Sequence, residues 1–275
     1  MRRSTRMLMA QETVAICDAG FYETSNGQRV NIANQIAKAK AGTMLYTPEK
    51  PPVTHEVEAK RQTLFEARNE TAFQALARLA ASGSGHLACL NFASAKNPGG
   101  GFLNGSLAQE EALACASGLY PCLLKAPQYY ERNRANRSAL YLDLVIFSPF
   151  VPFFRDDDGE LIGKPVLASV ITAPAPNAGA VAQNEPANSK QIEPTLRRRA
   201  ELVLEIAMAH QVDQLVLGAW GCGVFRNDPR AVARIFADLL QPGGRFAGAF
   251  GKVVFAVFDR SEGETTYRAF AERIN

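Results

Sequence analysis

Residues 86–111 read His-Leu-Ala-Cys-Leu-Asn-Phe-Ala-Ser-Ala-Lys-Asn-Pro-Gly-Gly-Gly-Phe-Leu-Asn-Gly-Ser-Leu-Ala-Gln-Glu-Glu. The stretch begins with an apolar run, His86–Ala93, which predicts a buried strand. Three consecutive glycines, Gly99–Gly101, follow this run and allow the backbone to pass close to a ligand where any Cβ would collide. A buried strand that leads into a glycine loop is typical of an α/β fold with a ligand site at the strand end.

A helix is predicted to begin directly after this loop. Ser106 and Gln109 are spaced as a capping box, and Leu107 opens the apolar stripe of the helix. Glu110 and Glu111 then lie within its first turn and a half, where carboxylates interact favourably with the helix dipole. No opposite charge lies near them in the sequence, which makes a purely structural role for this pair unusual.

The composition is that of an ordinary globular protein. At 275 residues the chain is long enough for one large domain or two small ones. It is 47% hydrophobic and 21% charged, both common values. The net charge of +3 is too small to indicate nucleic-acid binding by itself, although a slightly basic surface suits an anionic substrate.

The cysteines and the N-terminus indicate the compartment. An odd number of cysteines with no zinc-ligand spacing indicates free thiols and a reducing environment. The N-terminus has no apolar stretch of signal-peptide length, and no run in the chain is long enough to span a bilayer. We therefore expect a cytoplasmic protein. The five cysteines are Cys17, Cys89, Cys115, Cys122 and Cys222.

Strands and helices are predicted to alternate along the chain, and most strands are continuous apolar runs. This pattern indicates a mixed, mostly parallel sheet covered on both faces, so we expect one three-layer α/β/α domain with a helical N-terminal extension over 1–82 and a core over 83–275. Residues 177–190 are expected to be a loop, and Arg197–Arg199 a solvated helix face. Helices are predicted over 5–18, 31–41, 63–81, 193–210, 229–240 and 261–273, and strands over 44–46, 86–93, 141–147, 165–172, 214–220 and 252–258.

A second glycine loop follows the strand that ends at Trp220. It reads Gly-Cys-Gly-Val-Phe-Arg over 221–226, and Asp228 with Pro229 marks the start of the next helix. Glycines followed by a helix N-terminus expose backbone N–H groups and form an anion site. Two such anion sites suggest a nucleotide diphosphate bound between the loops. Neither loop has the pattern of a triphosphate-binding P-loop, so hydrolysis of a nucleoside triphosphate is not expected.

Glu110 and Glu111 are the acid–base candidates. Adjacent helical residues point about 100° apart, so the pair is not expected to flank one bond as the two carboxylates of a standard glycosidase do. One glutamate should perform the chemistry and the other should position a ligand. The alternative, two solvated glutamates at a helix start, remains open from their spacing alone.

Other catalytic groups are less well supported. The histidines, His55, His86 and His210, have no recognisable Ser/His/Asp or Cys/His context. Cys222 could be a reactive thiol at a helix N-terminus, but a small residue that permits close backbone approach is the better explanation. The run Asp156–Gly159 predicts a turn, because it lacks the later ligands of a calcium loop.

The glycine triplet, seven intervening residues and Gln109-Glu110-Glu111 resemble the signature of poly(ADP-ribose) glycohydrolases. The surrounding segments Asn91–Pro98, Gly118–Pro121 and Gly221–Phe225 resemble the compact bacterial type of that family. The resemblance extends from the first predicted helix to the last.

This resemblance implies a macrodomain fold that binds ADP-ribose and hydrolyses the ribose–ribose O-glycosidic bond of poly(ADP-ribose), with no metal and no other cofactor. By motif position Glu111 would be the catalytic acid, which protonates the leaving ribose oxygen and then, as a carboxylate, activates water. Glu110 would orient the scissile ribose. We expect a raised pKa for Glu111 from burial and from its neighbour Glu110.

The resemblance also implies the substrate contacts. The two loops would hold the diphosphate, Phe225 would press on the terminal ribose to aim its anomeric carbon, and Asn97 would contact a ribose hydroxyl. The implied substrate-binding residues are Asn97, Gly99, Gly100, Gly101, Gln109, Gly221, Cys222, Gly223, Val224 and Phe225.

The expected ligand is poly(ADP-ribose) or ADP-ribose, with ADP-ribosylated proteins as substrates and neither DNA nor a membrane as a partner. The family resemblance suggests release of ADP-ribose mainly from chain ends. Two alternatives remain: a macrodomain reader that binds ADP-ribose without cleaving it, and a hydrolase of another linkage, such as mono-ADP-ribosyl protein or O-acetyl-ADP-ribose. The intact Gln109–Glu111 argues against a reader, because a reader needs the diphosphate loops but not the acid.

Overall fold

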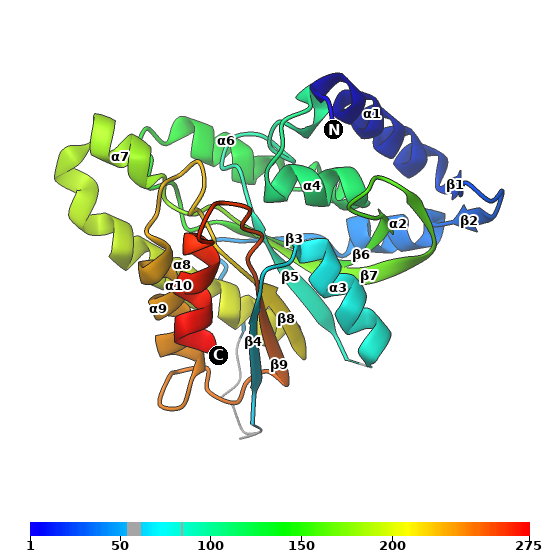
Figure 1. Cartoon of the computed structure of the whole chain (residues 1–275). Coiled ribbons are helices and arrows are strands. Elements are labelled where there is room, and N and C mark those ends of the chain that lie inside the picture. Colours follow the sequence, from blue (N-terminus) through cyan, green and yellow to red (C-terminus); the bar gives the residue numbers. More distant parts are fainter. Residues whose placement is uncertain (54–61, 84) are drawn as a thin grey trace.

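The computed structural model describes residues 1–53, 62–83 and 85–275. A seven-stranded sheet runs through its centre, in the spatial order β3-β6-β7-β5-β8-β9-β4 (Figure 1). The pairs from β7 to β4 are parallel and the pairs β3–β6 and β6–β7 are antiparallel, which confirms the predicted mixed, mostly parallel sheet. The strands are β3 (Met44–Tyr46), β4 (Leu64–Arg68), β5 (Leu87–Phe92), β6 (Val145–Arg155), β7 (Leu161–Ala173), β8 (Gln214–Leu217) and β9 (Lys252–Ala256).

Helices cover both faces of the sheet. They are α1 (Arg3–Ala19), α2 (Ala33–Ala41), α3 (Ala72–Ser82), α4 (Gln109–Ala116), α5 (Leu119–Leu123), α6 (Pro127–Ala135), α7 (Ala178–Asn184), α8 (Ile192–Ala209), α9 (Pro229–Leu240) and α10 (Thr265–Ile274), with 3₁₀ turns η1 (Phe102–Asn104) and η2 (Pro186–Gln191). In Figure 1, α8, α9 and α10 lie on one side of the strands, and α2, α3 and α4 on the other. Along β5, Ala88 and Leu90 pack in one buried cluster while Leu87 and Cys89 pack in the other. Because both faces are buried, these strands read as continuous apolar runs.

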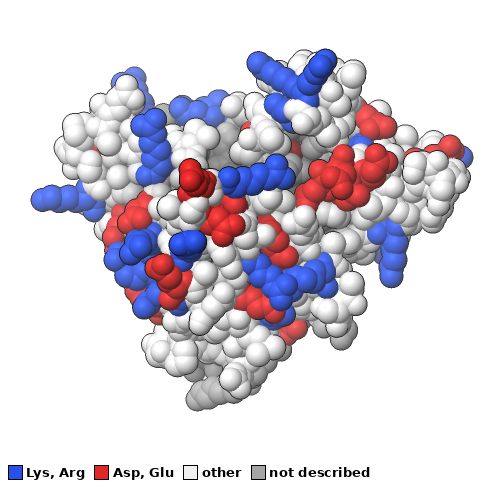
Figure 2. Space-filling model, viewed as in Figure 1, with Lys and Arg blue, Asp and Glu red and all other residues white. Residues whose placement is uncertain are grey.

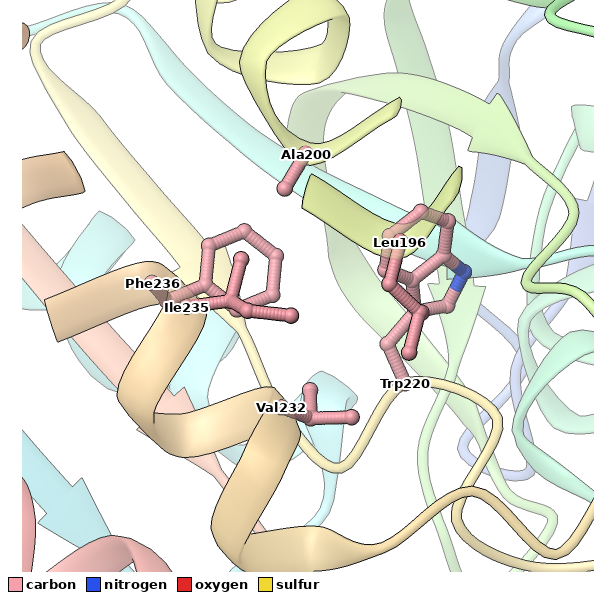
Figure 3. Close-up of a pocket in the computed structure, with 6 residues that line it drawn as sticks. All are labelled: Leu196, Ala200, Trp220, Val232, Ile235 and Phe236. Carbon is pink, nitrogen blue, oxygen red and sulfur yellow. The ribbon is translucent and has the colours of Figure 1, made fainter. Parts of the chain in front are cut away.

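Trp220 anchors the chain beyond β8 in the core. Its indole Nε1 donates to the carbonyl of Ala173 at the end of β7, 3.1 Å away. Its ring lies beside Leu196 of α8 and faces Val232 and Phe236 of α9 across a small apolar gap (Figure 3). The gap has no room for a water molecule, so it is a feature of packing and not a ligand site.

The helix predicted over 63–81 is wrong in its first part. Leu64–Arg68 forms the edge strand β4, parallel to β9, and α3 begins only at Ala72. A capping box marks this start: the N–H of Gln74 donates to Thr71 Oγ1 at 3.1 Å, and the N–H of Thr71 donates to Gln74 Oε1 at 3.0 Å. The Thr-x-x-Gln pattern was therefore the better signal, because apolar spacing alone does not separate a short strand from a helix.

The loop predicted over 177–190 is also wrong, since α7 and η2 occupy most of it. Asn177 Oδ1 accepts from the N–H of Ala180 at 2.9 Å and caps α7. Three of the five residues that follow Asn177 are alanine, which has the highest helix propensity. The cap and the alanines together outweigh the polar composition of the segment.

The strand predicted over 141–147 and the predicted N-terminal extension also differ from the structure. The strand predicted over 141–147 begins later, at Val145, and continues to Arg155, with Pro149 at a shift of its register against β7. Residues 1–82 are only partly helical, because they include a small hairpin, β1 (Phe21–Glu23) and β2 (Arg29–Asn31), and both edge strands of the main sheet. The division of the chain at residue 82 stays a prediction.

The turn over Asp156–Gly159 is confirmed and joins β6 to β7. His55 and Ser84 lie outside the described residues. Within the described residues, no helix has the length and apolar character that crossing a membrane requires.

Candidate active site

The glycine loop after β5 begins with a tight turn. The N–H of Gly100 donates to the carbonyl of Asn97 across 3.0 Å, with Pro98 and Gly99 between them. Gly99 has φ +68°, so Pro-Gly fits the type II turn that the chain makes here. The N–H of Asn97 donates to Ser94 Oγ at 3.1 Å. Asn97 therefore fixes the turn through its backbone, and the residue is exposed.

Both glutamates of α4 reach the middle of this turn. Gly100 has φ +60°, and a Cβ built on it would collide with Oε1 of Glu111 and lie 3.0 Å from Oε2 of Glu110. The N–H of Gly101 donates to the same oxygen of Glu111 at 2.9 Å. The two carboxylates therefore converge on one stretch of backbone, although adjacent helical residues start out about 100° apart. Only glycine at position 100 leaves room for both.

Glu110 is the buried member of the pair, with 3% of the residue exposed. Its Oε2 accepts from the N–H of Ser94 at 2.6 Å, and its Oε1 accepts from Asn91 Nδ2 at 3.4 Å. Burial raises the pKa of Glu110 to about 8; the bond from Ser94 opposes this shift and the charge of Glu111 adds to it. The sequence predicted burial and a raised pKa for Glu111, whereas the structure places both at its neighbour Glu110.

Glu111 is half-buried. Its Oε1 is held by the backbone of Gly101, while its Oε2 has no hydrogen-bond partner among the described residues. A carboxylate with one oxygen fixed and the other open can keep its orientation and still exchange a proton with a ligand.

The start of α4 differs from the predicted capping box of Ser106 and Gln109. No side chain caps the helix, and Leu107 is 71% exposed instead of opening an apolar stripe. Gln109 turns toward β5: its Oε1 accepts from the N–H of Phe92 at 2.9 Å, and its Nε2 donates to the carbonyl of Leu90 at 2.7 Å. Gln109 therefore ties the helix to the strand end, and its direct contact with substrate stays a prediction.

The N-terminal helix closes the far end of the glycine loop. Arg3 Nε donates to the carbonyl of Asn104 at 2.9 Å, and Arg6 Nε donates to that of Gly105 at 2.8 Å. Gly105 has φ +69°, and the carbonyl oxygen of Arg3 lies 2.6 Å from the position its Cβ would take. The two arginines thus belong to the architecture of the site, a role that the sequence did not suggest.

The second glycine loop, Gly221–Phe225, follows β8 and is held from behind. Gly221 has φ +73°, and a Cβ on it would lie 2.5 Å from both Ala175 and Asn227. Asn227 Nδ2 donates to the carbonyls of Pro176 at 2.8 Å and Gly221 at 3.0 Å. These bonds tie the loop to the chain that follows β7.

The front of the second loop is open. Nothing lies within 4 Å of a Cβ built on Gly223, and Val224 is 83% exposed. Among the described residues, the N–H groups of Gly223, Val224 and Phe225 have no hydrogen-bond acceptor. Three unpaired N–H groups just before the N-terminus of α9 are suited to binding an anion.

The side chains of the second loop have different environments. The ring of Phe225 is half-buried and lies 5.9 Å from the ring of Tyr141. Cys222 packs against the core, and burial raises the pKa of its thiol to about 12. A thiol that stays protonated at neutral pH is a poor nucleophile, which favours the packing interpretation of Cys222.

Both loops leave the same edge of the sheet, because β5 and β8 are parallel neighbours. A Cβ on Gly218, just beyond β8, would lie 3.0 Å from the ring of Phe92 at the end of β5. This is the upper edge in Figure 1, and Lys and Arg side chains gather above it over α1 and α6 (Figure 2). Positive charge at this edge suits an anionic ligand.

Acidic side chains gather elsewhere, over the turn that joins β6 to β7 (Figure 2). A surface hollow of about 460 Å³ separates this turn from α3, and none of the predicted site residues lines it. Within the described part of the chain, no cluster of His, Cys, Asp and Glu side chains could hold a metal ion. The hollow is lined by Glu70, Phe73, Gln74, Ala77, Arg78, Asp156, Asp157 and Asp158.

Asn91 and Ser94 are site residues that the sequence did not single out. Asn91 is fully buried and donates to both Glu110 and Thr172 Oγ1, the second at 3.2 Å. A polar residue near the end of a buried apolar strand was the available signal, because such a residue needs a specific partner. Ser94 acts on Glu110 through its backbone N–H, which no side-chain pattern could indicate.

Comparison with known proteins gives concordant results. The family described as microbial-type PARG, catalytic domain, matches residues 10–156, more than half of the chain. Poly(ADP-ribose) glycohydrolase (PARG) from Thermomonospora curvata is 45% identical with a TM-score of 0.92, over 98% of this chain and 99% of that one. The structure of that enzyme bound to the inhibitor ADP-HPD is 46% identical with a TM-score of 0.91, over the same shares.

A third structure is poly(ADP-ribose) glycohydrolase from Deinococcus radiodurans in complex with ADP-ribose. It is 48% identical with a TM-score of 0.80, over 89% of this chain and 98% of that one. No curated protein sequence matches the chain. On the family match, the identity to these enzymes and the shared macrodomain-like fold, the chain belongs to the microbial-type poly(ADP-ribose) glycohydrolases, which are glycosidases.

Proposed function

We propose that this enzyme releases ADP-ribose from the ends of poly(ADP-ribose) by hydrolysing ribose–ribose O-glycosidic bonds, with Glu111 as the general acid and base. The observation that carries this proposal is the convergence of Glu110 and Glu111 on Gly100, at the edge where β5 ends. The relatives bound to ADP-ribose and to ADP-HPD support ADP-ribose as the group that is recognised.

Glu111 is the better candidate for proton transfer because one of its oxygens is open. With Oε1 held by Gly101, Oε2 can protonate the leaving ribose oxygen as the glycosidic bond breaks. The resulting carboxylate then takes a proton from the water that attacks the anomeric carbon. Glu110 has no such freedom, because Ser94 and Asn91 occupy both of its oxygens.

Glu110 has a supporting role in this scheme. With a pKa of about 8 its carboxyl is mostly neutral at pH 7, so it does not repel the carboxylate that forms on Glu111. Its carboxyl is fixed beside Gly100 next to Glu111, which suits the role of orienting the scissile ribose.

The two loops supply the binding surface. The unpaired N–H groups of Gly223, Val224 and Phe225 would bind the diphosphate, with the backbone of Gly99–Gly101 approaching it from the first loop. The Phe225 ring would press on the terminal ribose, and the exposed Asn97 would contact a ribose hydroxyl. Poly(ADP-ribose) attached to modified proteins is the substrate in this proposal.

The substitution Glu111→Gln tests the proposal, because it keeps the shape of the side chain and removes its proton. Turnover of poly(ADP-ribose) should fall by about 10³-fold while the Kd for ADP-ribose changes less than threefold, roughly, since general acid–base groups contribute to rate and not to ground-state binding. Glu131→Gln is the matched control, because Glu131 is an exposed glutamate of α6. Wild-type turnover by Glu111→Gln contradicts the assignment.

Product analysis separates the alternative functions. Early release of ADP-ribose alone from a polymer of defined length supports cleavage at chain ends, whereas early accumulation of shorter oligomers contradicts it. Turnover restricted to a mono-ADP-ribosylated peptide indicates a different linkage. Binding of ADP-ribose without turnover of either substrate indicates a reader.

A further inference from the structure

Arg199 is the buried member of the arginine run on α8. Arg197 and Arg198 lie at the surface, where they pair with Asp238 and Asp143, as the prediction of a solvated face requires. Arg199 is 0% exposed, so the prediction is wrong for this residue. A buried guanidinium destabilises a protein unless acceptors surround it, so its surroundings need a specific explanation.

Acceptors from two segments, residues 140–143 and Pro174, surround Arg199. Its Nε donates to Asp143 Oδ1 at 3.1 Å, and its Nη1 donates to the carbonyl of Pro174 at 2.6 Å. Its Nη2 donates to the carbonyls of Leu140 at 3.1 Å and Tyr141 at 3.3 Å. Pro174 directly follows β7 and Tyr141 precedes β6, so one cation joins two stretches of chain at the edge of the sheet that carries the site.

The segment 138–142 lies outside the sheet, and side chains hold its backbone. The N–H of Ala139 donates to Glu185 Oε1 at 2.6 Å, and the N–H of Leu142 donates to Asn133 Oδ1 at 3.0 Å. Within this segment Tyr141 has φ +59°, a conformation that a bulky residue adopts only when its surroundings impose it. The two carbonyl bonds from Arg199 are part of what imposes it.

The segment presents Tyr141 to the candidate site. The ring of Tyr141 packs against the ring of Phe225 at 5.9 Å between centroids and 47° between planes. Tyr129 connects the segment to the acid pair. Asn133, which accepts from the N–H of Leu142, donates its Nδ2 to the carbonyl of Tyr129 at 3.0 Å. The Tyr129 hydroxyl donates to the carbonyl of Ser94 at 3.4 Å, and the N–H of Ser94 donates to Glu110. Arg199, Tyr141, Phe225 and Glu110 are therefore parts of one neighbourhood.

We propose that Arg199 is a positioning residue for substrate binding: by holding Leu140 and Tyr141 it sets the Tyr141 ring behind Phe225 and so fixes the aromatic surface that receives the terminal ribose. The inference rests on the ribose contact proposed for Phe225. Arg199 does not touch the ligand in this proposal, but it affects the affinity for ADP-ribose by positioning the Tyr141 ring.

The substitution Arg199→Lys tests this proposal, because it keeps the charge but loses the planar fork that serves several acceptors at once. The Kd for ADP-ribose and the KM for polymer should rise about tenfold, the effect of losing one or two charge-assisted hydrogen bonds. Arg198→Lys is the matched control: Arg198 pairs with the same Asp143 from an exposed position, and its Kd should stay within about twofold of wild type.

A double-mutant cycle shows whether Arg199 acts through Tyr141. Tyr141→Ala should weaken ADP-ribose binding by itself, and adding Arg199→Lys to it should change the Kd by less than about twofold, because both substitutions remove the same positioning. Losses that multiply, or an Arg199→Lys variant that binds as wild type does, overturn the proposal. A general loss of structure would lower the melting temperature and would persist in the Tyr141→Ala background.

If Arg199→Lys does not fold, Glu185→Gln tests the same segment from its other side. It should raise the Kd about threefold in the wild-type background and leave it unchanged in the Tyr141→Ala background, and equal effects in both overturn the proposal. Phe225→Leu separates this inference from the proposed function. Wild-type binding by Phe225→Leu refutes the role of Phe225, whereas weakened binding by Phe225→Leu with wild-type binding by Arg199→Lys refutes only the role of Arg199.

Discussion

In the first glycine loop a Cβ on Gly100 would collide with Glu111, whereas in the second loop nothing lies within 4 Å of a Cβ on Gly223. The two carboxylates of α4 pack against the backbone of the first loop, and Arg3 and Arg6 of α1 donate hydrogen bonds to the carbonyls at its end. The second loop is bonded by Asn227 and by the N–H of Gly179, which donates to the carbonyl of Phe225 at 3.0 Å. Its N–H groups at Gly223, Val224 and Phe225 have no acceptor among the described residues. Glycine thus makes room for the protein's own carboxylates in the first loop, whereas in the second loop it leaves open space where we propose that the diphosphate binds.

Replacing Gly100 and Gly223 by alanine should give the largest difference in kcat between the two loops. Gly100→Ala adds a Cβ at φ +60° that displaces both carboxylates. We expect kcat on poly(ADP-ribose) to fall at least 100-fold, roughly, because a shift of about 1 Å at a catalytic group has effects of that size. Steady-state kinetics on a defined polymer measures this.

Gly223→Ala is the matched substitution in the second loop. Its Cβ has open space, and alanine keeps the N–H group that would bind the diphosphate. The Kd for ADP-ribose should change less than threefold, roughly, and the free energy of unfolding less than about 0.5 kcal/mol. Equal losses of kcat for the two alanine variants would remove the distinction between the loops.

The second-largest expected difference between the loops is in the pH dependence of the ionisable groups at each of them. Glu110 has a pKa of about 8 against an ordinary 4.5, whereas the ionisable group of the second loop, Cys222, has a pKa of about 12. Because the folded state holds the Glu110 proton more tightly, this group stabilises the fold fully below about pH 4.5, and its contribution is lost as the pH rises through about 8.

Glu110→Gln removes this titration. Between about pH 5 and pH 8, the free energy of unfolding of wild type should fall relative to that of Glu110→Gln by an amount on the order of 3 kcal/mol. Urea unfolding of both proteins at several pH values measures the difference. A difference that does not vary with pH would contradict the burial of a neutral Glu110.

Removing a hydrogen bond between α1 and the first loop should have a moderate effect on kcat. Arg6→Ala deletes the bond to the carbonyl of Gly105, and we expect kcat to fall about fivefold, the loss of roughly 1 kcal/mol of positioning. Arg2→Ala is the control, because Arg2 makes no side-chain hydrogen bond among the described residues. The same kcat for both variants would show that α1 does not organise the loop.

Cys222→Ser should have the smallest effect. The thiol stays protonated at neutral pH and packs inward, so kcat should stay within about twofold of wild type. Turnover after treatment of wild type with a thiol-alkylating reagent gives an independent measurement. A loss of turnover on the order of 100-fold in the serine variant would restore the thiol as a candidate nucleophile.

Two occurrences of one sequence pattern show where prediction from sequence ends. Thr71 with Gln74 forms a capping box, while Ser106 with Gln109 has the same spacing and forms none. The reason is tertiary: Gln109 lies beside the end of β5, whose backbone groups at Leu90 and Phe92 bond its carboxamide. Local spacing specifies which bonds are available, and the neighbouring strand decides which one forms.

The sequence by itself determined the order of strand, glycine loop and helix, the mostly parallel sheet buried on both faces, both loops of the candidate site and the pair Glu110 and Glu111. These features depend on local periodicity and on residue types that tolerate few alternatives. Only the tertiary structure decided that Glu110 is the buried glutamate, that Oε2 of Glu111 has no partner among the described residues, and that Arg199 is fully buried. Burial and hydrogen bonding depend on what packs around a residue. The partners of the two glutamates come from the end of β5 and the glycine loop, and those of Arg199 come from segments 25 to 59 residues away.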